Sequence, residues 1–423
     1  MSTMTKTTPQ PAADDQTSAA TTLKSAFNDY VARIRGGDVG SLPAVFGLIV
    51  LVTVFSILKP QSFTNSFNFA NLLNQSAGVI VLAMGLVFVL LLGEIDLSAG
   101  YTAATGAAIL GYLMVDKDWP VVPAVLACLA SGAVIGLGIG LLVSRLGIPS
   151  FVVTLAAFLA LQGVVIKILG EGGSFSYSNE FLVNLNTAPL SVTTGWVLTV
   201  IGLAAYAAVT YLKNARRRAR GLVHQPVLLW AIKTGALAVL VVAAVAYLSV
   251  ERSRNPAFTS LKGVPQVLLL IVALLVVLSF LLSSTPWGRH VYAVGGNSEA
   301  ARRAGINVAW IKLSCFLMCS TLAAVAGILI ASRDNGVSGD TGGSQTLLFA
   351  VGAAVIGGTS LFGGKGKVSD AVIGGLVISV IANGMPLLQA TPATVLIVTG
   401  FVLLIAASVD AISRQRSAAT GRA

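Results

Sequence analysis

Polar side chains that could do chemistry gather in three glycine-rich segments that interrupt long apolar runs. The first segment, Gly93–Gly100, reads GEIDLSAG and places two carboxylates, Glu94 and Asp96, close to Ser98. Carboxylates beside such apolar runs cost free energy unless they are paired or hydrated. Asp96 or Ser98 could instead cap the next helix, because a side-chain oxygen there accepts hydrogen bonds from its first amides. Gly100 would then lie in the first turn of that helix.

The second segment, 357–367, reads GGTSLFGGKGK and superficially resembles a phosphate-binding loop. That loop requires glycine where this chain has Thr359, and Ser or Thr where it has Gly366. The pattern therefore fails twice, and we expect no nucleotide site and no enzymatic activity in this chain. The glycines fit a sharp break between two apolar helices, and they comprise Gly357, Gly358, Gly363 and Gly364.

The third segment is a polar, basic stretch from Pro286 to Val308. A short helix is expected over Glu299–Ala304, with Asn297 or Ser298 as its cap and Gly305 at its end. A short helix with small and basic residues could dock into a groove on a soluble partner, or it could be a simple connector. The residues proposed for docking are Asn297, Ser298, Glu299, Ala300, Ala301, Arg302, Arg303 and Gly305.

The composition shows which elements must position these segments. Hydrophobic residues make up 55% of the chain and charged residues only 10%, whereas soluble domains average roughly 25% charged residues. The apolar runs have the length that crosses a hydrocarbon core about 30 Å thick. We therefore predict an all-α integral membrane protein, a bundle of about twelve transmembrane segments with some broken or re-entrant. The expected spans are Leu42–Leu58, Leu72–Leu92, Ala99–Val115, Val121–Val143, Phe151–Leu169, Trp196–Leu212, Val227–Val250, Val264–Leu282, Trp310–Ala331, Thr346–Leu361, Ala371–Leu388 and Ala393–Val409.

The loop charges predict the direction of these spans, because basic loops stay in the cytoplasm. Twelve crossings that start inside place the basic segment 213–225 and Arg289 in the cytoplasm, with both termini. They also place the polar stretch Glu171–Glu180 outside. Orientation thus explains the net charge of +11 better than a nucleic-acid partner does.

The domain boundaries follow from the same pattern. We predict a disordered cytoplasmic tail over 1–40, a transmembrane domain over 41–411 that includes a polar loop at 285–309, and a cytoplasmic tail over 412–423. Cys128, Cys315 and Cys319 lie inside apolar runs, and no metal site is expected there.

The motifs together point to a family. Gly93–Gly100 resembles the GGIDLSVG signature of permease subunits from bacterial ATP-driven importers of the ribose and xylose class. Gly147–Leu155 looks like their GIPPFIVTL element, and Tyr292–Val308 is similar to their loop that meets the ATPase. Ile356–Gly364 resembles their late glycine-rich element. The extra segment around 212–262 resembles the longer xylose-type branch.

The resemblance implies a division of labour in a bacterial cell membrane. Two permease chains would form the pathway in the lipid bilayer, and two cytoplasmic ATPase subunits would hold ATP and Mg. An external binding protein would deliver the sugar, with xylose as the first expectation. The permease itself would carry no cofactor. Glu94 departs from the family's glycine, and either it and Asp96 only position a helix or they take part in transport or subunit contact.

Sugar passage requires hydrogen-bonding groups inside the spans. The clearest candidates are Gln162 and Asn383, with Thr154 and Ser379 behind them. Such side chains often bond neighbouring helices instead. The main alternative function is an ion-coupled secondary sugar transporter, which would be expected to bury ionisable groups near the membrane centre. A passive channel or scaffold is a further alternative.

Overall fold

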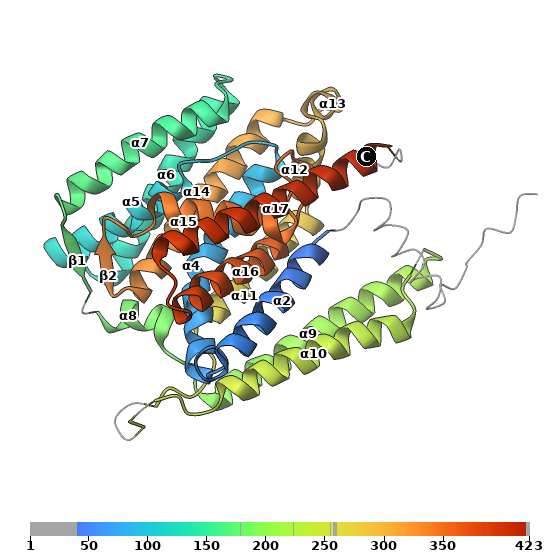
Figure 1. Cartoon of the computed structure of the whole chain (residues 1–423). Coiled ribbons are helices and arrows are strands. Elements are labelled where there is room, and N and C mark those ends of the chain that lie inside the picture. The colour runs from blue at the N-terminus through green and yellow to red at the C-terminus, as the bar shows by residue number, and fades with distance from the viewer. Residues whose placement is uncertain (1–39, 178, 223, 254, 257–259, 420–423) are drawn as a thin grey trace, which may run out of the picture. The chain divides into compact units, whose positions relative to one another are not determined.

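A computed structural model of the protein describes residues 40–419, except 178, 223, 254 and 257–259 (Figure 1). The expected tail of residues 1–40 therefore lies outside the described residues, apart from Gly40. The described chain forms two compact units. One unit is formed by Thr193–Ala246, and the other contains the remaining described residues.

Each predicted span coincides with a helix, which confirms the all-α membrane fold. Among the described residues, nine helices are long and apolar enough to cross a membrane, and two more apolar helices, α2 and α15, are shorter. The helices of the larger unit that correspond to spans are α2 (Leu42–Leu58), α4 (Ser66–Leu91), α5 (Ala99–Gly111), α6 (Val121–Ser144), α7 (Ser150–Leu169), α11 (Val267–Ser284), α14 (Val308–Arg333), α15 (Gly343–Gly357), α16 (Val368–Leu387) and α17 (Pro392–Ala419).

Two of these elements are too short to cross alone. At 1.5 Å per residue, α5 with 13 residues and α15 with 15 residues extend about 20 Å and about 22 Å. The chain continues from α5 into a π-helical turn, Tyr112–Asp116. After α15, a glycine-rich turn separates the helix from α16. The predicted break at 357–366 is thus present between two helices.

Helices α4 and α14 form the centre of the larger unit. α4 packs against α14, α15 and α16, while α14 also packs against α5 and α6. Their side chains are largely buried, from Ala77 to Leu91 on α4 and around Phe316 on α14. On α6, Gly136 faces the Phe316 carbonyl so closely that an added Cβ would lie 2.7 Å from its oxygen. Small residues therefore allow the close helix packing that membrane bundles use.

Outside the predicted spans and the segment 285–309, four short elements were not predicted. They are α3 (Pro60–Phe63), β1 (Ser174–Ser176), α8 (Glu180–Thr187) and β2 (Gly336–Ser338). The strand β1 pairs antiparallel with β2, with Phe175 opposite Val337, and so joins the segments that follow α7 and α14 (Figure 1). Asn179 caps α8 by accepting from the amide of Phe181 at 3.1 Å, a cap that the Asn-Glu pair signals locally.

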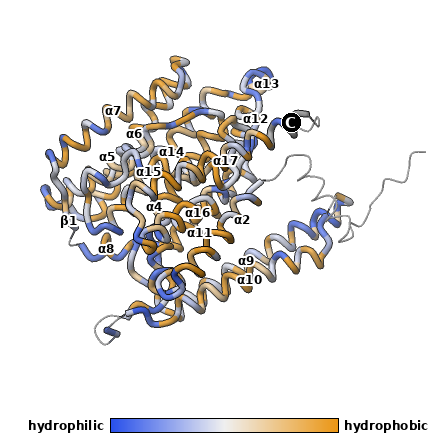
Figure 2. The backbone as a smooth tube through the Cα atoms, in the orientation of Figure 1, coloured by the Kyte–Doolittle hydropathy of each residue, from blue (hydrophilic) through white to orange (hydrophobic). Residues whose placement is uncertain are grey.

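The smaller unit consists mainly of two helices, α9 (Val192–Ala219) and α10 (Val227–Leu248). The segment 213–225 was expected to be a loop, but α9 continues through its first half. Lys and Arg are good helix formers, and cations are favourable near a helix C-terminus. Figure 2 shows this end of the two helices as hydrophilic and their bodies as mostly apolar.

Candidate transport-coupling site

The polar segment between α11 and α14 folds into two helices, α12 (Pro286–Gly296) and α13 (Ser298–Arg303). α13 agrees with the expected short helix to within one residue. Asn297 is the cap, because its Oδ1 accepts from the amide of Ala300 at 2.9 Å. α12 was missed, although Thr285 before Pro286 is a recognisable start signal. Thr285 Oγ1 accepts from the amide of Gly288 at 3.1 Å.

α13 is a short, exposed and charged helix (Figure 2). Only its Ala301 is buried, while the side chains of Glu299, Arg302 and Arg303 are more than half exposed. Glu299 lies 3.7 Å from Arg302 and 3.3 Å from Arg303, and exposed pairs of this kind contribute little to stability. Gly305 ends the helix with a positive φ of 84°. This surface is therefore available for a partner, and none of its charges is needed to hold the bundle together.

α12 connects α13 to the core. Val291 and Val294 are buried, and the Trp287 ring lies 5.7 Å from the Phe88 ring on α4. Trp287 Nε1 donates to Ser314 Oγ on α14 at 2.8 Å. Tyr292 donates its hydroxyl proton to the carbonyl of Gly366 at 2.7 Å, which ties α12 to the second motif.

The three predicted motifs meet at the inner side of α12. The amide of Gly364 donates to the carbonyl of Leu91 at 2.9 Å. A Cβ added to Gly295 would overlap that same carbonyl oxygen, and one added to Gly363 would lie 2.8 Å from both Gly295 O and Gly93 N. Backbone is packed directly on backbone here, and such dense packing leaves no free space between α12 and the two glycine-rich segments.

The first motif is fixed by its own carboxylates. Asp96 is 1% exposed, and its Oδ1 accepts from the Ser98 amide at 2.9 Å and the Ser98 hydroxyl at 2.6 Å. This geometry is a turn just before α5, in which Asp96 positions Ser98, the residue that precedes the helix. The Ser98 side chain itself makes no capping hydrogen bond to the first amides of α5. Burial raises the pKa of the Asp96 carboxyl above its usual range, and the hydrogen bonds from Ser98 oppose that rise. Gly100 approaches α15 so closely that a Cβ would overlap the Gly343 carbonyl oxygen.

Glu94, the departure from the family pattern, forms an ion pair with Lys312 on α14. Both side chains are less than one quarter exposed, at 17% and 24%. Lys312 was missed in the sequence, because a single lysine near the start of an apolar run has no local partner. The pair joins the first motif to the helix that follows α13.

The second motif closes on α16 and α17. Asp370 Oδ2 accepts from the Lys367 amide at 2.7 Å and from Thr359 Oγ1 at 3.3 Å. A Cβ at Gly357 would overlap the Asp370 carbonyl oxygen. Ser360 Oγ donates to Asp410 on α17 at 3.2 Å. Gly358 has a left-handed φ of 119°, which favours glycine at this turn.

The sequence of the chain is similar to that of known proteins. Residues 68–407 match the family described as "Branched-chain amino acid transport system / permease component". The chain belongs to this permease family. It is 32% identical over 373 residues to the xylose transport system permease protein of Escherichia coli strain K12, which covers 88% of this chain and 92% of that one. No solved structure matches the chain.

Two further relatives agree with the predicted resemblance to ribose- and xylose-type permeases. The xylose transport system permease protein of Haemophilus influenzae is 33% identical over 375 residues, which is 88% of this chain and 96% of the relative. The ribose import permease protein of Escherichia coli strain K12 is 29% identical over 368 residues, 87% of this chain and 92% of that relative. The chain is thus a multi-pass membrane permease component, as the sequence predicted.

The four candidate pathway residues of the permease lie on two helices. Thr154 and Gln162 are on α7, which packs against α5 and α6, whereas Ser379 and Asn383 are on α16, which packs against α2, α4 and α15. Thr154 is buried, and its hydroxyl lies 2.8 Å from the Ser150 carbonyl.

The amide of Asn383 faces Asn68 on α4. Asn68 Nδ2 donates to Asn383 Oδ1 at 2.8 Å, and Asn383 Nδ2 donates back to Asn68 Oδ1 at 3.0 Å. Ser379, one turn earlier on α16, is also buried. The reciprocal pair joins two helices, and a role for these residues in lining a pathway stays a prediction.

Proposed function

We propose that this chain forms the translocation pathway for a monosaccharide in an importer that is driven by a separate ATPase. The observation that carries the proposal is the backbone contact of Gly295 with Leu91 and Gly364, which connects the exposed α13 to the buried motifs. The relatives' names, which include xylose, ribose and D-allose permeases, support a monosaccharide with xylose first.

The mechanism follows from this connection. Closure of two ATPase subunits, which would hold ATP and Mg, pushes on the surface formed by residues 297–305. A ligand shifts a conformational equilibrium only by its different affinity for the two states. The packed glycine contacts make the bundle respond as a unit, so it opens alternately to the two sides. A second permease chain completes the pathway, and an external binding protein delivers the sugar.

The proposed topology places α13 and both termini in the cytoplasm. In the described residues, the three motifs lie at one end, while β1 and β2 pair after the opposite ends of α7 and α14, which supports a position of α13 and β1 on different sides of the membrane. The transmembrane domain would comprise residues 41–411, with residues 412–423 as a cytoplasmic extension whose first part continues α17.

The test is uptake into proteoliposomes that contain the permease, its ATPase and its binding protein. We expect uptake of radiolabelled xylose or another monosaccharide, and we expect it to require ATP on the side of the membrane where α13 lies. Depending on how the protein is inserted, that side faces the inside or the outside of the vesicle. The family description also names branched-chain amino acids, so leucine is the matched alternative substrate. Sugar entry driven by an ion gradient without ATP, or ATP-driven uptake of leucine alone, would contradict the proposal.

A further inference from the structure

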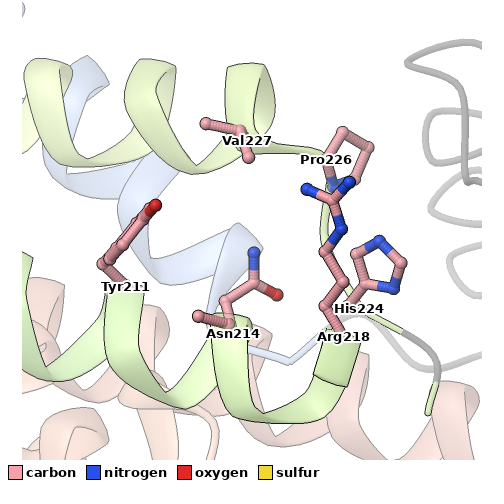
Figure 3. A pocket seen from close by; sticks show the side chains of 7 residues that line it. Tyr211, Asn214, Arg218, His224, Pro226 and Val227 are labelled. Carbon is pink, nitrogen blue, oxygen red and sulfur yellow. The ribbon is translucent and has the colours of Figure 1, made fainter. Parts of the chain in front are cut away.

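A cavity lies within the smaller unit, where α9 and α10 approach their connecting turn (Figure 3). Its volume is about 220 Å³. The cavity is lined by Tyr211, Asn214, Ala215, Arg218, His224, Pro226 and Val227. Arg218 and His224 bring cationic or polar nitrogen atoms to it, and none of its lining residues is acidic.

Hydrogen bonds and ring packing hold the cavity in shape. Asn214 donates from Nδ2 to the Gln225 carbonyl at 2.8 Å, and its Oδ1 accepts from the Gln225 amide at 2.9 Å. Across the two helices, Trp230 Nε1 donates to Thr210 Oγ1 at 2.9 Å, and the Trp230 ring lies 5.2 Å from the Tyr211 ring. These contacts hold the C-terminal half of α9 against the start of α10 and against Gln225, which precedes it.

The charge of this hairpin is one-sided. No Asp or Glu occurs in the sequence from Phe181 to Val250, whereas the same stretch contains Lys213, Arg216, Arg217, Arg218, Arg220 and Lys233. The C-terminus of α9 supplies only about half a negative charge, and the N-terminus of α10 opposes it. The local charge of this end of the hairpin therefore favours an anionic ligand.

The position of the cavity along the helices indicates which anionic ligands can reach it. The apolar part of α9, residues 192–212, has 21 residues and is about 31 Å long, enough to cross the hydrocarbon core. Lys213 follows directly, so the cavity lies where the helices leave the hydrocarbon. Tyr211 and Trp230 lie at this expected boundary, where aromatic residues are enriched in membrane proteins.

We propose that this cavity binds the phosphate group of an anionic membrane lipid. Arg218 would donate to the phosphate oxygens from its planar guanidinium. His224 lies next to Arg218, and Tyr211 lines the cavity farther along α9, beyond Asn214 (Figure 3). The acyl chains would follow the exposed apolar residues Val209 and Leu228 just inside the interface. An inorganic phosphate has the same headgroup chemistry but gains nothing from this apolar surface.

The test measures lipid binding to the full-length, delipidated protein in detergent by native mass spectrometry. We expect phosphatidylglycerol to bind more tightly than phosphatidylcholine. Arg218→Gln should weaken phosphatidylglycerol binding about five-fold, which corresponds to about 1 kcal/mol for one basic residue at the surface. The matched control is Arg220→Gln, which removes the same charge in the adjoining turn but does not line the cavity, and should change binding by less than about two-fold.

Three results would overturn the proposal. Equal binding of both lipids would exclude headgroup recognition, and equal losses in the two variants would show a diffuse basic surface instead of a built site. The third experiment adds inorganic phosphate to the lipid-bound protein. If phosphate displaces the lipid at equal concentration, the cavity is a site for soluble phosphate and not for a lipid. Arg218→Lys, which keeps the charge, should restore part of the binding, and an unchanged melting temperature of each variant shows that the hairpin remains folded.

Discussion

The carboxylate of Glu94 forms an ion pair with the ammonium group of Lys312, across 218 positions of sequence. The pair connects the loop between α4 and α5 to the first turn and a half of α14. Since α13 directly precedes α14, the pair is part of the connection between the exposed α13 and the buried motifs.

Breaking this pair should impair both folding and coupling. We expect Glu94→Gln or Lys312→Gln to cost roughly 1–3 kcal/mol of unfolding free energy, less than a fully buried pair, because each side chain keeps some contact with water. Thermal unfolding in detergent measures the loss. The exchanged double variant, Glu94→Lys with Lys312→Glu, should regain stability, and a failure to regain any would count against a direct pairing.

Gly295 and Gly296 provide a matched pair of variants in α12. A Cβ at Gly295 would overlap the Leu91 carbonyl oxygen, whereas one at Gly296 would meet nothing within 4 Å. Gly295→Ala should therefore lower stability by about 1–3 kcal/mol through overpacking. Gly296→Ala should be neutral or slightly stabilising, since alanine favours helix. Equal melting temperatures for the two variants would disprove the close contact.

Reversing the charge of α13 should separate ATP hydrolysis from uptake. Glu299→Arg changes an exposed side chain that only pairs with Arg302 and Arg303, so the protein should insert and melt normally. We expect sugar uptake to fall at least about ten-fold, a coupling loss of about 1.4 kcal/mol, while hydrolysis by the ATPase continues. Gly305→Ala, which strains a positive φ, should have a similar effect.

The control for this variant is Glu180→Arg. Glu180 is also exposed in the first turn of a short helix, but that helix is α8, away from the three motifs. Normal coupled uptake in Glu299→Arg would remove α13 from the mechanism, as would an equal loss in Glu180→Arg.

Asn383 allows its two possible roles to be distinguished. If it acts only through its reciprocal bonds with Asn68, Asn383→Ala should lower stability by about 0.5–2 kcal/mol and leave the KM for sugar unchanged. If it also lines the pathway, KM or sugar preference should change as well. Asn68→Ala is the informative comparison, because it removes the same bonds from the other helix.

Acid should loosen the connection between α10 and α11. The Glu251 carboxylate accepts from the amides of Ser253 and Leu261 at 2.9 Å and 3.0 Å, and these bonds lower its pKa from 4.5 to about 2. A lowered carboxyl pKa stabilises the fold above pH 4.5, and this stabilisation is lost as the pH falls toward 2.

Hydrogen exchange of these two amides, corrected for intrinsic rates, measures this effect. Protection in the native protein should decrease as the pH falls below about 4.5. Glu251→Gln should show weaker protection at neutral pH and little further change with acid. A native protein whose protection is the same at pH 3 and pH 7 would contradict the role of this carboxylate.

The local features of this protein could be predicted from its sequence. Apolar runs determine which segments enter a membrane, because each residue's transfer free energy is largely independent of its distant neighbours. Caps are also local, and so the helix after Asn297 and the turn at Asp96 were recognisable from adjacent residues. The extension of α9 beyond Lys213 could not be recognised in this way. Helix propensity favoured a continued helix for these residues, whereas their charge favoured a cytoplasmic loop.

The long-range relationships were decided only by the tertiary structure. No spacing in the sequence pairs Glu94 with Lys312, Asn68 with Asn383, or Gly295 with Leu91. These contacts depend on how the helices pack, and packing is set by the shapes of many side chains together. The sequence by itself therefore determined a many-helix membrane protein with three polar, glycine-rich segments. The tertiary structure decided that those segments meet behind one exposed helix, because close backbone contact requires glycines from three distant parts of the chain to arrive at one place.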